Sequence, residues 1–310
     1  MAENFDQKKD QRPIVCGTDF SATAVEAVDI AAAMARQLGT KLVLVHVEEF
    51  RGLGVADRAL FEATISHKRE ELEREATRLR NLGTAVEQKL LSGSVFDELV
   101  DAASESNARL MIVGAVGHGV ARRLLVGSVA ERVAETSSVP TMVVRPGGRL
   151  GSWIRGEHSL KVLLGYDFSA ASDAALRWLN EMRPFGPREI SVLYVDWPPD
   201  EAHRLGYHGP LPLTENPREI QNFLERDLGE RVAMALAPEK VTITVEPGWG
   251  HPEGYLFEMA HRQHVDLVVV GTHRRHGWGR LRFGSVSRTV LRHAGVTVAV
   301  IPQESTQDRQ

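Results

Sequence analysis

The sequence predicts an α/β protein built from two tandem, doubly wound parallel-sheet domains of the Rossmann-like kind. Short apolar runs alternate with amphipathic segments along the chain, a pattern typical of parallel strands connected by helices. The chain also repeats itself, because "GTDFS" at 17–21 returns as "GYDFS" at 165–169, and 114–129 corresponds to 271–286. A chain of 310 residues also suits two domains of roughly 150 residues each.

The repeats give the predicted domain organisation. We expect a first domain at 1–146, a linker at 147–159 and a second domain at 160–303. Between its two repeated motifs, the second half is longer than the first by about nine residues. We assign these extra residues to the Pro- and Gly-rich stretch 196–217 and predict a loop there.

In the first half, β-branched apolar runs predict the strands, and capping residues predict the limits of the helices. The strand at 13–18 ends beside a glycine, and Ser21 is a suitable N-cap for the alanine-rich helix that reaches Leu38. The segment 84–91 alternates polar and apolar residues, which favours a strand near a sheet edge. The other predicted elements are strands at 41–47, 108–114 and 141–146 and helices at 56–82, 95–106 and 128–137.

The second half follows the same order. Its predicted strands are 160–168, 189–196, 240–246, 265–271 and 296–302, and its helices begin at Ser172, Asn216, about 254 and Ser285. The last strand of each half is short and apolar, and an unpaired apolar edge favours aggregation. We therefore expect these two strands to pair with each other, as a pseudo-dimer within one chain, or with another chain.

Composition excludes several classes of protein. The net charge of −4 gives no support for nucleic-acid binding. Cys16 is the one cysteine, so no intrachain disulfide can form, and a cytoplasmic location is expected. No apolar run approaches the eighteen residues of a membrane span, and the polar N-terminal stretch does not resemble a signal peptide.

Glycines cluster after the strand at 108–114. Ligands of open α/β sheets bind beyond the carboxyl ends of the strands. Gly114 would let the chain leave the sheet, and Gly117 would let a ligand touch bare backbone. Gly127 and Ser128 precede a helix whose free amides and dipole favour an anion, and Ser128 could cap that helix or donate to a phosphate. The spacing matches neither the dinucleotide motif nor the P-loop. A flexible loop without a ligand is the alternative.

The pattern Gly114-x2-Gly117-x9-Gly127-Ser128-Val129, with "GTDFS" after the first strand and "LVHV" in the second, resembles the universal stress protein family. The resemblance covers both halves and implies the adenine nucleotide alpha hydrolase-like fold. It also implies binding of ATP with Mg²⁺ and a tendency to form homodimers. The site residues that it implies in the first half are Asp19, Val47, Gly114, Gly117, Gly127, Ser128 and Val129.

The resemblance assigns a second set of residues to the second half. These are Asp167, Val195, Gly271, Gly284, Ser285 and Val286. Arg274 stands where the first half has Gly117. An arginine could pair with phosphate, but its Cβ would stand where the backbone should approach the ligand. We expect crowding by the Cβ to outweigh pairing with phosphate, so that the second site is weaker or altered.

Other residues have less specific interpretations. Arg122 and Arg123 either screen phosphate charge or are solvated loop residues. His273 and His276 in "HRRH" form only a weak metal signal without a third ligand. We interpret Cys16 as a core thiol and place His46 and Tyr194 at the edges of the two pockets.

No catalytic motif is present, neither a nucleophile elbow, nor H-E-x-x-H, nor a phosphate loop with a lysine. The leading hypothesis is therefore an ATP-binding stress or signalling module that acts on an unknown protein partner. A slow ATPase and a scaffold without nucleotide binding remain the alternatives.

Overall fold

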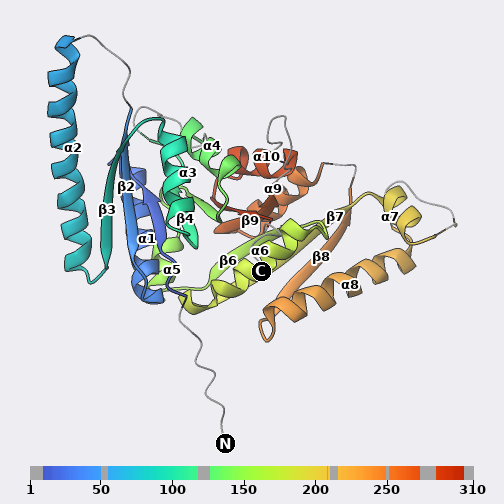
Figure 1. The fold of residues 1–310 in the computed structure, drawn as a ribbon. Coiled ribbons are helices and arrows are strands. Elements are labelled where there is room, and N and C mark those ends of the chain that lie inside the picture. Colours follow the sequence, from blue (N-terminus) through green and yellow to red (C-terminus); the bar gives the residue numbers. More distant parts are fainter. Residues whose placement is uncertain are drawn as a thin grey trace, which may run out of the picture.

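The computed structural model describes residues 10–49, 55–117, 126–207, 209, 216–248, 251–272 and 284–303. In these ranges ten strands form one sheet, in the order β3-β2-β1-β4-β5-β10-β9-β6-β7-β8 (Figure 1). The strands are β1 Ile14–Gly17, β2 Leu42–Glu48, β3 Val86–Ser92, β4 Leu110–Gly114, β5 Thr141–Val144, β6 Leu160–Tyr166, β7 Arg188–Asp196, β8 Val241–Pro247, β9 Leu267–Thr272 and β10 Thr297–Pro302. Each half contributes five of them in the same doubly wound order, which confirms the predicted fold class.

The two halves join along β5 and β10. These strands pair antiparallel, with Val143 opposite Val298, whereas every other pairing in the described part of the sheet is parallel. The predicted pairing of the final strands within one chain is therefore confirmed. Because this one pairing is antiparallel, the carboxyl ends of the first-half strands and of the second-half strands point to opposite ends of the sheet.

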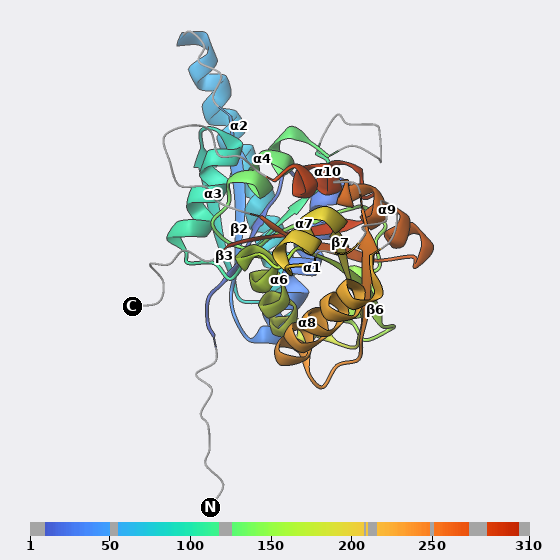
Figure 2. The same ribbon diagram turned by 90° about the vertical axis from the view of Figure 1, so that its right-hand side faces the viewer.

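Helices cover both faces of the sheet (Figures 1 and 2). One apolar layer contains residues of α1, α2, α6 and α8, and the other contains residues of α3, α4, α9 and α10. Both layers run across the junction of the two halves. The helices are α1 Ala22–Leu38, α2 Val55–Asn81, α3 Val95–Glu105, α4 Ser128–Thr136, α5 Leu150–Ile154, α6 Ala170–Glu181, α7 Pro198–Arg204, α8 Arg218–Leu236, α9 Pro252–Arg262 and α10 Ser285–His293, with a 3₁₀ turn at Arg183–Phe185. None of the helices in the described ranges is long and apolar enough to cross a membrane.

The helix that follows the first strand of each half begins at a serine cap. The Ser21 side chain accepts a hydrogen bond from the amide of Ala24 at 3.3 Å, as predicted for α1. Gly39 ends that helix in the left-handed conformation, with a φ of 68°. In the second half, Ser169 caps α6 and the helix begins at Ala170, two residues earlier than predicted.

Two segments that were predicted as connections contain helices. The predicted loop at 196–217 includes α7, because Pro198 and Pro199 fit the first turn of a helix, where an amide donor is not needed. The predicted linker at 147–159 includes α5. Its Trp153 is fully buried and donates from Nε1 to the carbonyl of Pro187 at 2.8 Å, so this segment is anchored to the second half.

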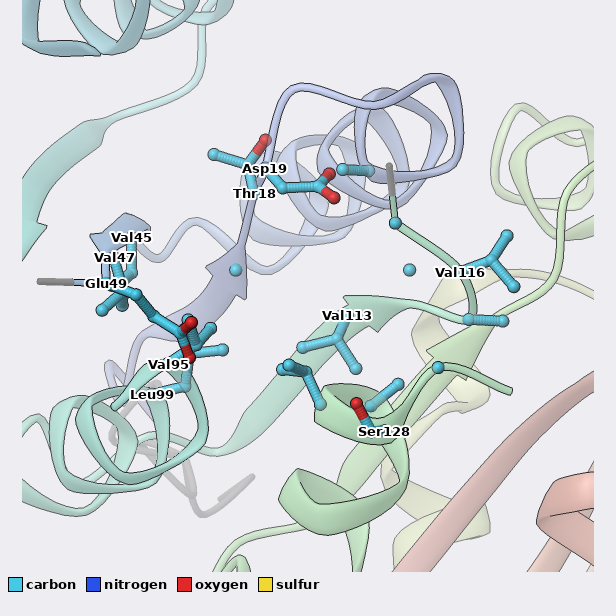
Figure 3. A pocket seen from close by; sticks show the side chains of 18 residues that line it. Thr18, Asp19, Val45, Val47, Glu49, Val95, Leu99, Val113, Val116 and Ser128 are labelled. Atoms are coloured by element: carbon cyan, nitrogen blue, oxygen red, sulfur yellow. The ribbon is translucent and has the colours of Figure 1, made fainter. Parts of the chain in front are cut away.

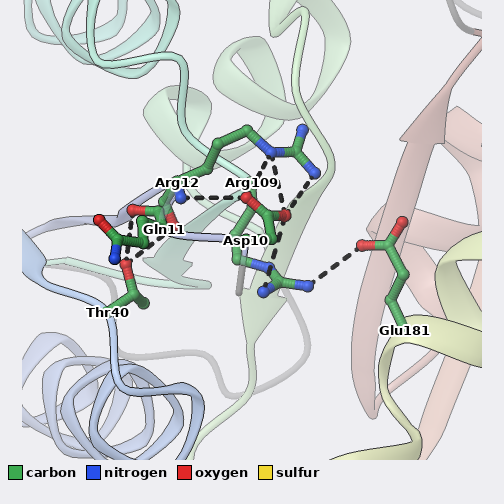
Figure 4. Close-up of polar contacts among 6 residues, drawn as sticks. All are labelled: Asp10, Gln11, Arg12, Thr40, Arg109 and Glu181. Carbon is green, nitrogen blue, oxygen red and sulfur yellow. Dashed lines mark hydrogen bonds and ion pairs between the residues drawn. The ribbon is translucent and has the colours of Figure 1, made fainter. Parts of the chain in front are cut away.

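Polar contacts also connect the halves near the start of the chain (Figure 4). Arg109 of the first half lies 3.8 Å from Asp10 and 3.3 Å from Glu181 of the second half. Asp10 also accepts hydrogen bonds from Arg12, and these bonds lower the pKa of the Asp10 carboxyl. The Gln37 side chain adds a bond of 2.8 Å to the carbonyl of Pro184.

Candidate functional site

A cavity of about 540 Å³ lies at the carboxyl ends of β1, β2 and β4 in the first half (Figure 3). The strand order reverses between β1 and β4, which is where doubly wound sheets place their ligands. In Figure 3, Val45, Val47 and Glu49 lie on one side of the cavity and Val116 on the other. Every residue assigned to the first site lines it: Asp19, Val47, Gly114, Gly117, Gly127, Ser128 and Val129.

The Asp19 carboxylate is held by the turn after β1. Its Oδ1 atom accepts a hydrogen bond from the amide of Ser21 at 3.0 Å. Its Oδ2 atom lies against Gly117, where a Cβ on that residue would come well inside 3.0 Å. A side chain at 117 would therefore displace the Asp19 carboxylate from this position, so Gly117 preserves it in addition to exposing backbone to the cavity.

Gly114 has a packing role that the sequence did not suggest. A Cβ at this position would meet Thr23 Cγ2 at 3.1 Å and the amide nitrogen of Ala24 at 3.2 Å, so the glycine lets β4 pack against the first turn of α1. Gly271 does the same in the second half. Its Cβ would meet the carbonyl carbon of Ala171 at 2.6 Å.

The N-terminus of α4 faces the same cavity. Its N-cap is Gly127, which has no side chain to bond the first amides of the helix, and Ser128 is the first helical residue. The hypothesis that Ser128 caps the helix is therefore wrong. The Gly127 amide donates to the carbonyl of Ala115 at 2.7 Å, which fixes the glycine against the end of β4. The first amides of a helix have no acceptor within the helix, so this end is suited to an anion.

Backbone groups of Val47 are directed toward the cavity. Along β2, the amide of Leu42 bonds the carbonyl of Ala85 beside β3, and the carbonyl of Val45 accepts from Thr18 beside β1. Alternate residues of a strand bond to opposite neighbours, so Val47 directs its N–H and C=O to the β1 side. Since β1 ends at Gly17, these groups point into the space beyond that strand.

His46 and Tyr194 do not line the cavities, and their predicted place at the pocket edges is wrong. Adjacent strand residues face opposite sides of a sheet, so both residues lie on the opposite face from Val47 and Val195. His46 packs against the ring of Phe20 and Tyr194 against that of Phe168, each with ring centroids 4.8 Å apart. The carbonyl of Thr18 lies 2.7 Å from His46 Nδ1, and we assign the proton to this nitrogen.

Sequence reasoning missed the two phenylalanines. Phe20 has a φ of 64° and Phe168 a φ of 59°, a left-handed conformation that is strained for a bulky residue. Strain of this kind persists only where the surroundings enforce it, and here the aromatic contact and the serine cap on the next residue do so. The repetition of "DFS" in both halves is the sequence feature that could have identified these two phenylalanines.

A second cavity, of about 270 Å³, lies at the carboxyl ends of the second-half strands. All six residues assigned to the second site line it: Asp167, Val195, Gly271, Gly284, Ser285 and Val286. Leu193 takes the place of the smaller Val45. Gly248 lies against Val195, and the Tyr255 hydroxyl donates to the carbonyl of Pro247 at 3.1 Å.

The remaining candidate residues are three arginines, two histidines and one cysteine. Arg122, Arg123, Arg274, His273 and His276 lie outside the described residues. Within the described ranges, no group of three or more His, Cys, Asp and Glu side chains could hold a metal ion. Cys16 is fully buried, as expected for a core thiol, and this burial raises the pKa of its thiol.

Comparison with known proteins identifies the family of the chain. The model of the universal stress protein family matches residues 11–145 and 159–302. A universal stress protein of Mycolicibacterium smegmatis is 28% identical over 302 residues, which cover 93% of this chain and 96% of that protein.

Solved structures share the fold over nearly the whole chain. A universal stress protein from Archaeoglobus fulgidus has a TM-score of 0.68 at 21% identity, covering 95% of this chain and 99% of its own. A protein of unknown function from Pseudomonas aeruginosa has a TM-score of 0.60 at 13% identity, covering 96% of this chain and 94% of its own. With the family model matched twice, the chain belongs to the universal stress protein family and contains two copies of its domain in tandem.

Proposed function

We propose that the first half binds an adenine nucleotide, ATP with Mg²⁺, and that a protein partner responds to the bound state. One observation supports this most directly. The 540 Å³ cavity combines bare glycine backbone, a helix N-terminus without a side-chain cap, and the Asp19 carboxylate. Its volume lies within the range of roughly 300–1,000 Å³ that is typical of small-molecule sites.

Each part of the cavity suits one part of the nucleotide. The amides at the start of α4 and the Ser128 hydroxyl would donate to the phosphates. The Asp19 carboxylate would accept from the ribose hydroxyls, and the Val47 backbone groups offer a donor and an acceptor to adenine. The ion would be held mainly by the phosphates and water, as is usual for Mg²⁺, and would need no set of protein carboxylates.

We further propose that the second half binds nucleotide more weakly or in an altered form. The cavity there has about half the volume, and Arg274 replaces the glycine that corresponds to Gly117. The protein would act in the cytoplasm, where ATP is available. A domain at 1–146 would thus bind ATP most tightly, and one at 160–303 would serve as its structural counterpart.

Calorimetric titration of the full-length protein with ATP and Mg²⁺ tests the proposal. We expect one tight site, which Gly127→Val abolishes because a branched side chain crowds the phosphates. Gly117→Arg should remove this site, whereas Arg274→Gly should strengthen the second. An ATP titration without heat, or two equal sites in the unaltered protein, would contradict the proposal. Analysis of the nucleotide after incubation separates binding from slow hydrolysis, since a binding module leaves ATP intact.

A further inference from the structure

Helices α4 and α10 lie next to each other at the junction of the two halves and bear opposite charges. Glu131 of α4 accepts a hydrogen bond from Arg292 Nε of α10 at 2.7 Å, and Glu135 accepts one from Arg288 Nε at 2.7 Å. The order of the pairs is reversed along the two helices, so the helices run antiparallel. Both carboxylates are partly buried, with side-chain exposures of 16% and 20%.

These four residues occupy equivalent positions in the internal repeat. When "SVAERVAET" at 128–136 is aligned with "SVSRTVLRH" at 285–293, Glu131 corresponds to Arg288 and Glu135 to Arg292. Glu131 therefore contacts the counterpart of Glu135, and Glu135 contacts the counterpart of Glu131, which is the reciprocal arrangement of a twofold interface. In a true twofold dimer the two helices would be identical. Here both acids are on the first copy and both bases are on the second.

The strands at the same junction discriminate little between partners. β5 contributes Thr141, Met142 and Val143 to the pairing, and β10 contributes Val298, Ala299 and Val300. Both sets are short and apolar, so either strand is able to pair with another copy of itself through the same backbone hydrogen bonds. The charges of α4 and α10 do discriminate, because pairing two first halves would bring four carboxylates together and pairing two second halves would bring four guanidinium groups together.

We propose that the charges at the α4–α10 contact determine which halves associate. Opposite charges allow a first half to pair with a second half, and repulsion between like charges disfavours the pairing of two like halves. Ion pairs at partly exposed positions contribute little attraction, whereas like charges brought together at an interface are strongly unfavourable. The four residues therefore act chiefly on the choice of partner, and the partner that fits α4 is the α10 face of a second half. The specificity of the pairing thus comes mainly from the repulsion that raises the free energy of the two like pairings.

Full-length variants reproduce each disfavoured arrangement inside one chain. One double variant, Arg288→Glu with Arg292→Glu, places four carboxylates at the contact, as two first halves would. The other, Glu131→Arg with Glu135→Arg, places four guanidinium groups there, as two second halves would. The variant with all four changes restores opposite charges with the polarity reversed. As a matched control, Glu230→Arg places like charges at the exposed Arg226–Glu230 pair of α8, away from the junction. Thermal unfolding is measured at low and high salt.

We expect each double variant to unfold several degrees below the unaltered protein, with a deficit that shrinks in high salt because exposed charges are screened there. The variant with all four changes should regain most of this loss, and the control should change little. If a double variant does not fold, the neutral changes Glu131→Gln and Arg292→Gln, alone and together, measure the same coupling. Double variants as stable as the unaltered protein, or no recovery when all four residues are exchanged, would overturn the proposal.

Discussion

The carboxylate of Asp19 occupies the place where residue 117 would carry its Cβ atom. Asp19 comes from the turn after β1, and Gly117 follows β4, so two segments almost a hundred residues apart meet here at the mouth of the cavity. Glycine at 117 thus leaves the Asp19 carboxylate where it is, whereas any larger residue would make it move.

Gly117→Ala should weaken ATP binding by about tenfold or more, because the methyl group displaces Asp19 and costs a charge-assisted hydrogen bond to the ligand. Calorimetry measures the affinity. Gly229→Ala in α8 is the matched control, since its Cβ would make only an ordinary contact of 3.7 Å with Ile243, and it lines neither cavity. Equal affinities for the two variants would show that Asp19 does not depend on Gly117.

Gly271→Ala should destabilise the protein more than Gly114→Ala. At 271 the methyl group would overlap backbone atoms of Ala171 and Ser172 at 2.6–2.8 Å, whereas at 114 the nearest atoms lie at 3.1–3.2 Å. Overpacking of this kind costs about 1–3 kcal/mol, and we expect Gly271→Ala at the upper end. Urea unfolding of the two variants gives the comparison, and the reverse ranking would contradict it.

Asp196 should make the protein less stable as the pH rises from about 4 to about 6. Burial raises the pKa of this carboxyl to about 6, although Asn216 donates a hydrogen bond of 3.0 Å to its Oδ1 atom, and nearby Glu201 adds to the increase. The folded protein therefore holds a proton that the unfolded chain releases at lower pH, so stability is lost as the pH approaches 6.

Asp196→Asn removes this titration while keeping an oxygen that accepts from Asn216. The variant should gain stability relative to the unaltered protein between about pH 4 and pH 6, and the gain should level off above that range. Urea unfolding across this pH range measures the difference. Parallel pH profiles for the two proteins would show that Asp196 does not titrate in this way.

Arg145→Gln should lower the free energy of unfolding by about 1–3 kcal/mol, the usual cost of leaving buried polar groups without partners. The buried guanidinium donates to the carbonyls of Leu291 and Arg292 at the end of α10, at 3.2 and 3.3 Å, and burial lowers its pKa. Chemical denaturation provides the measurement. An unchanged midpoint and slope would mean that water replaces these bonds at no cost.

Most of the fold follows from local signals in the sequence. Ser21 and Gly39 mark the limits of α1, and the polar alternation at 84–91 correctly identifies β3 as an edge strand. The repeated final strands also predict that β5 and β10 pair with each other. These features depend on residues close together in the chain or on comparison of the two copies.

What the sequence did not reveal depends on contacts between distant residues. In the sequence Gly114 indicates only that the chain turns after the strand. The structure shows that α1 packs against this position and leaves little room for a side chain. His46 lies next to a cavity residue in the chain, yet the alternation of a strand turns it to the other face, toward Phe20. Helix α5 is too short to show periodicity, and the burial of Trp153 holds it in place.

The antiparallel β5–β10 junction has a consequence for how the two cavities can change. In a dimer of identical subunits, each substitution near the axis appears twice, and the subunits separate on dilution. Here the counterpart of each domain is tethered at a fixed ratio of one to one, so association does not depend on protein concentration. A difference such as glycine at 117 and arginine at the corresponding position 274 is then confined to one copy. The second copy can therefore diverge in sequence while the first retains its motif, because the β5–β10 junction keeps the two copies paired.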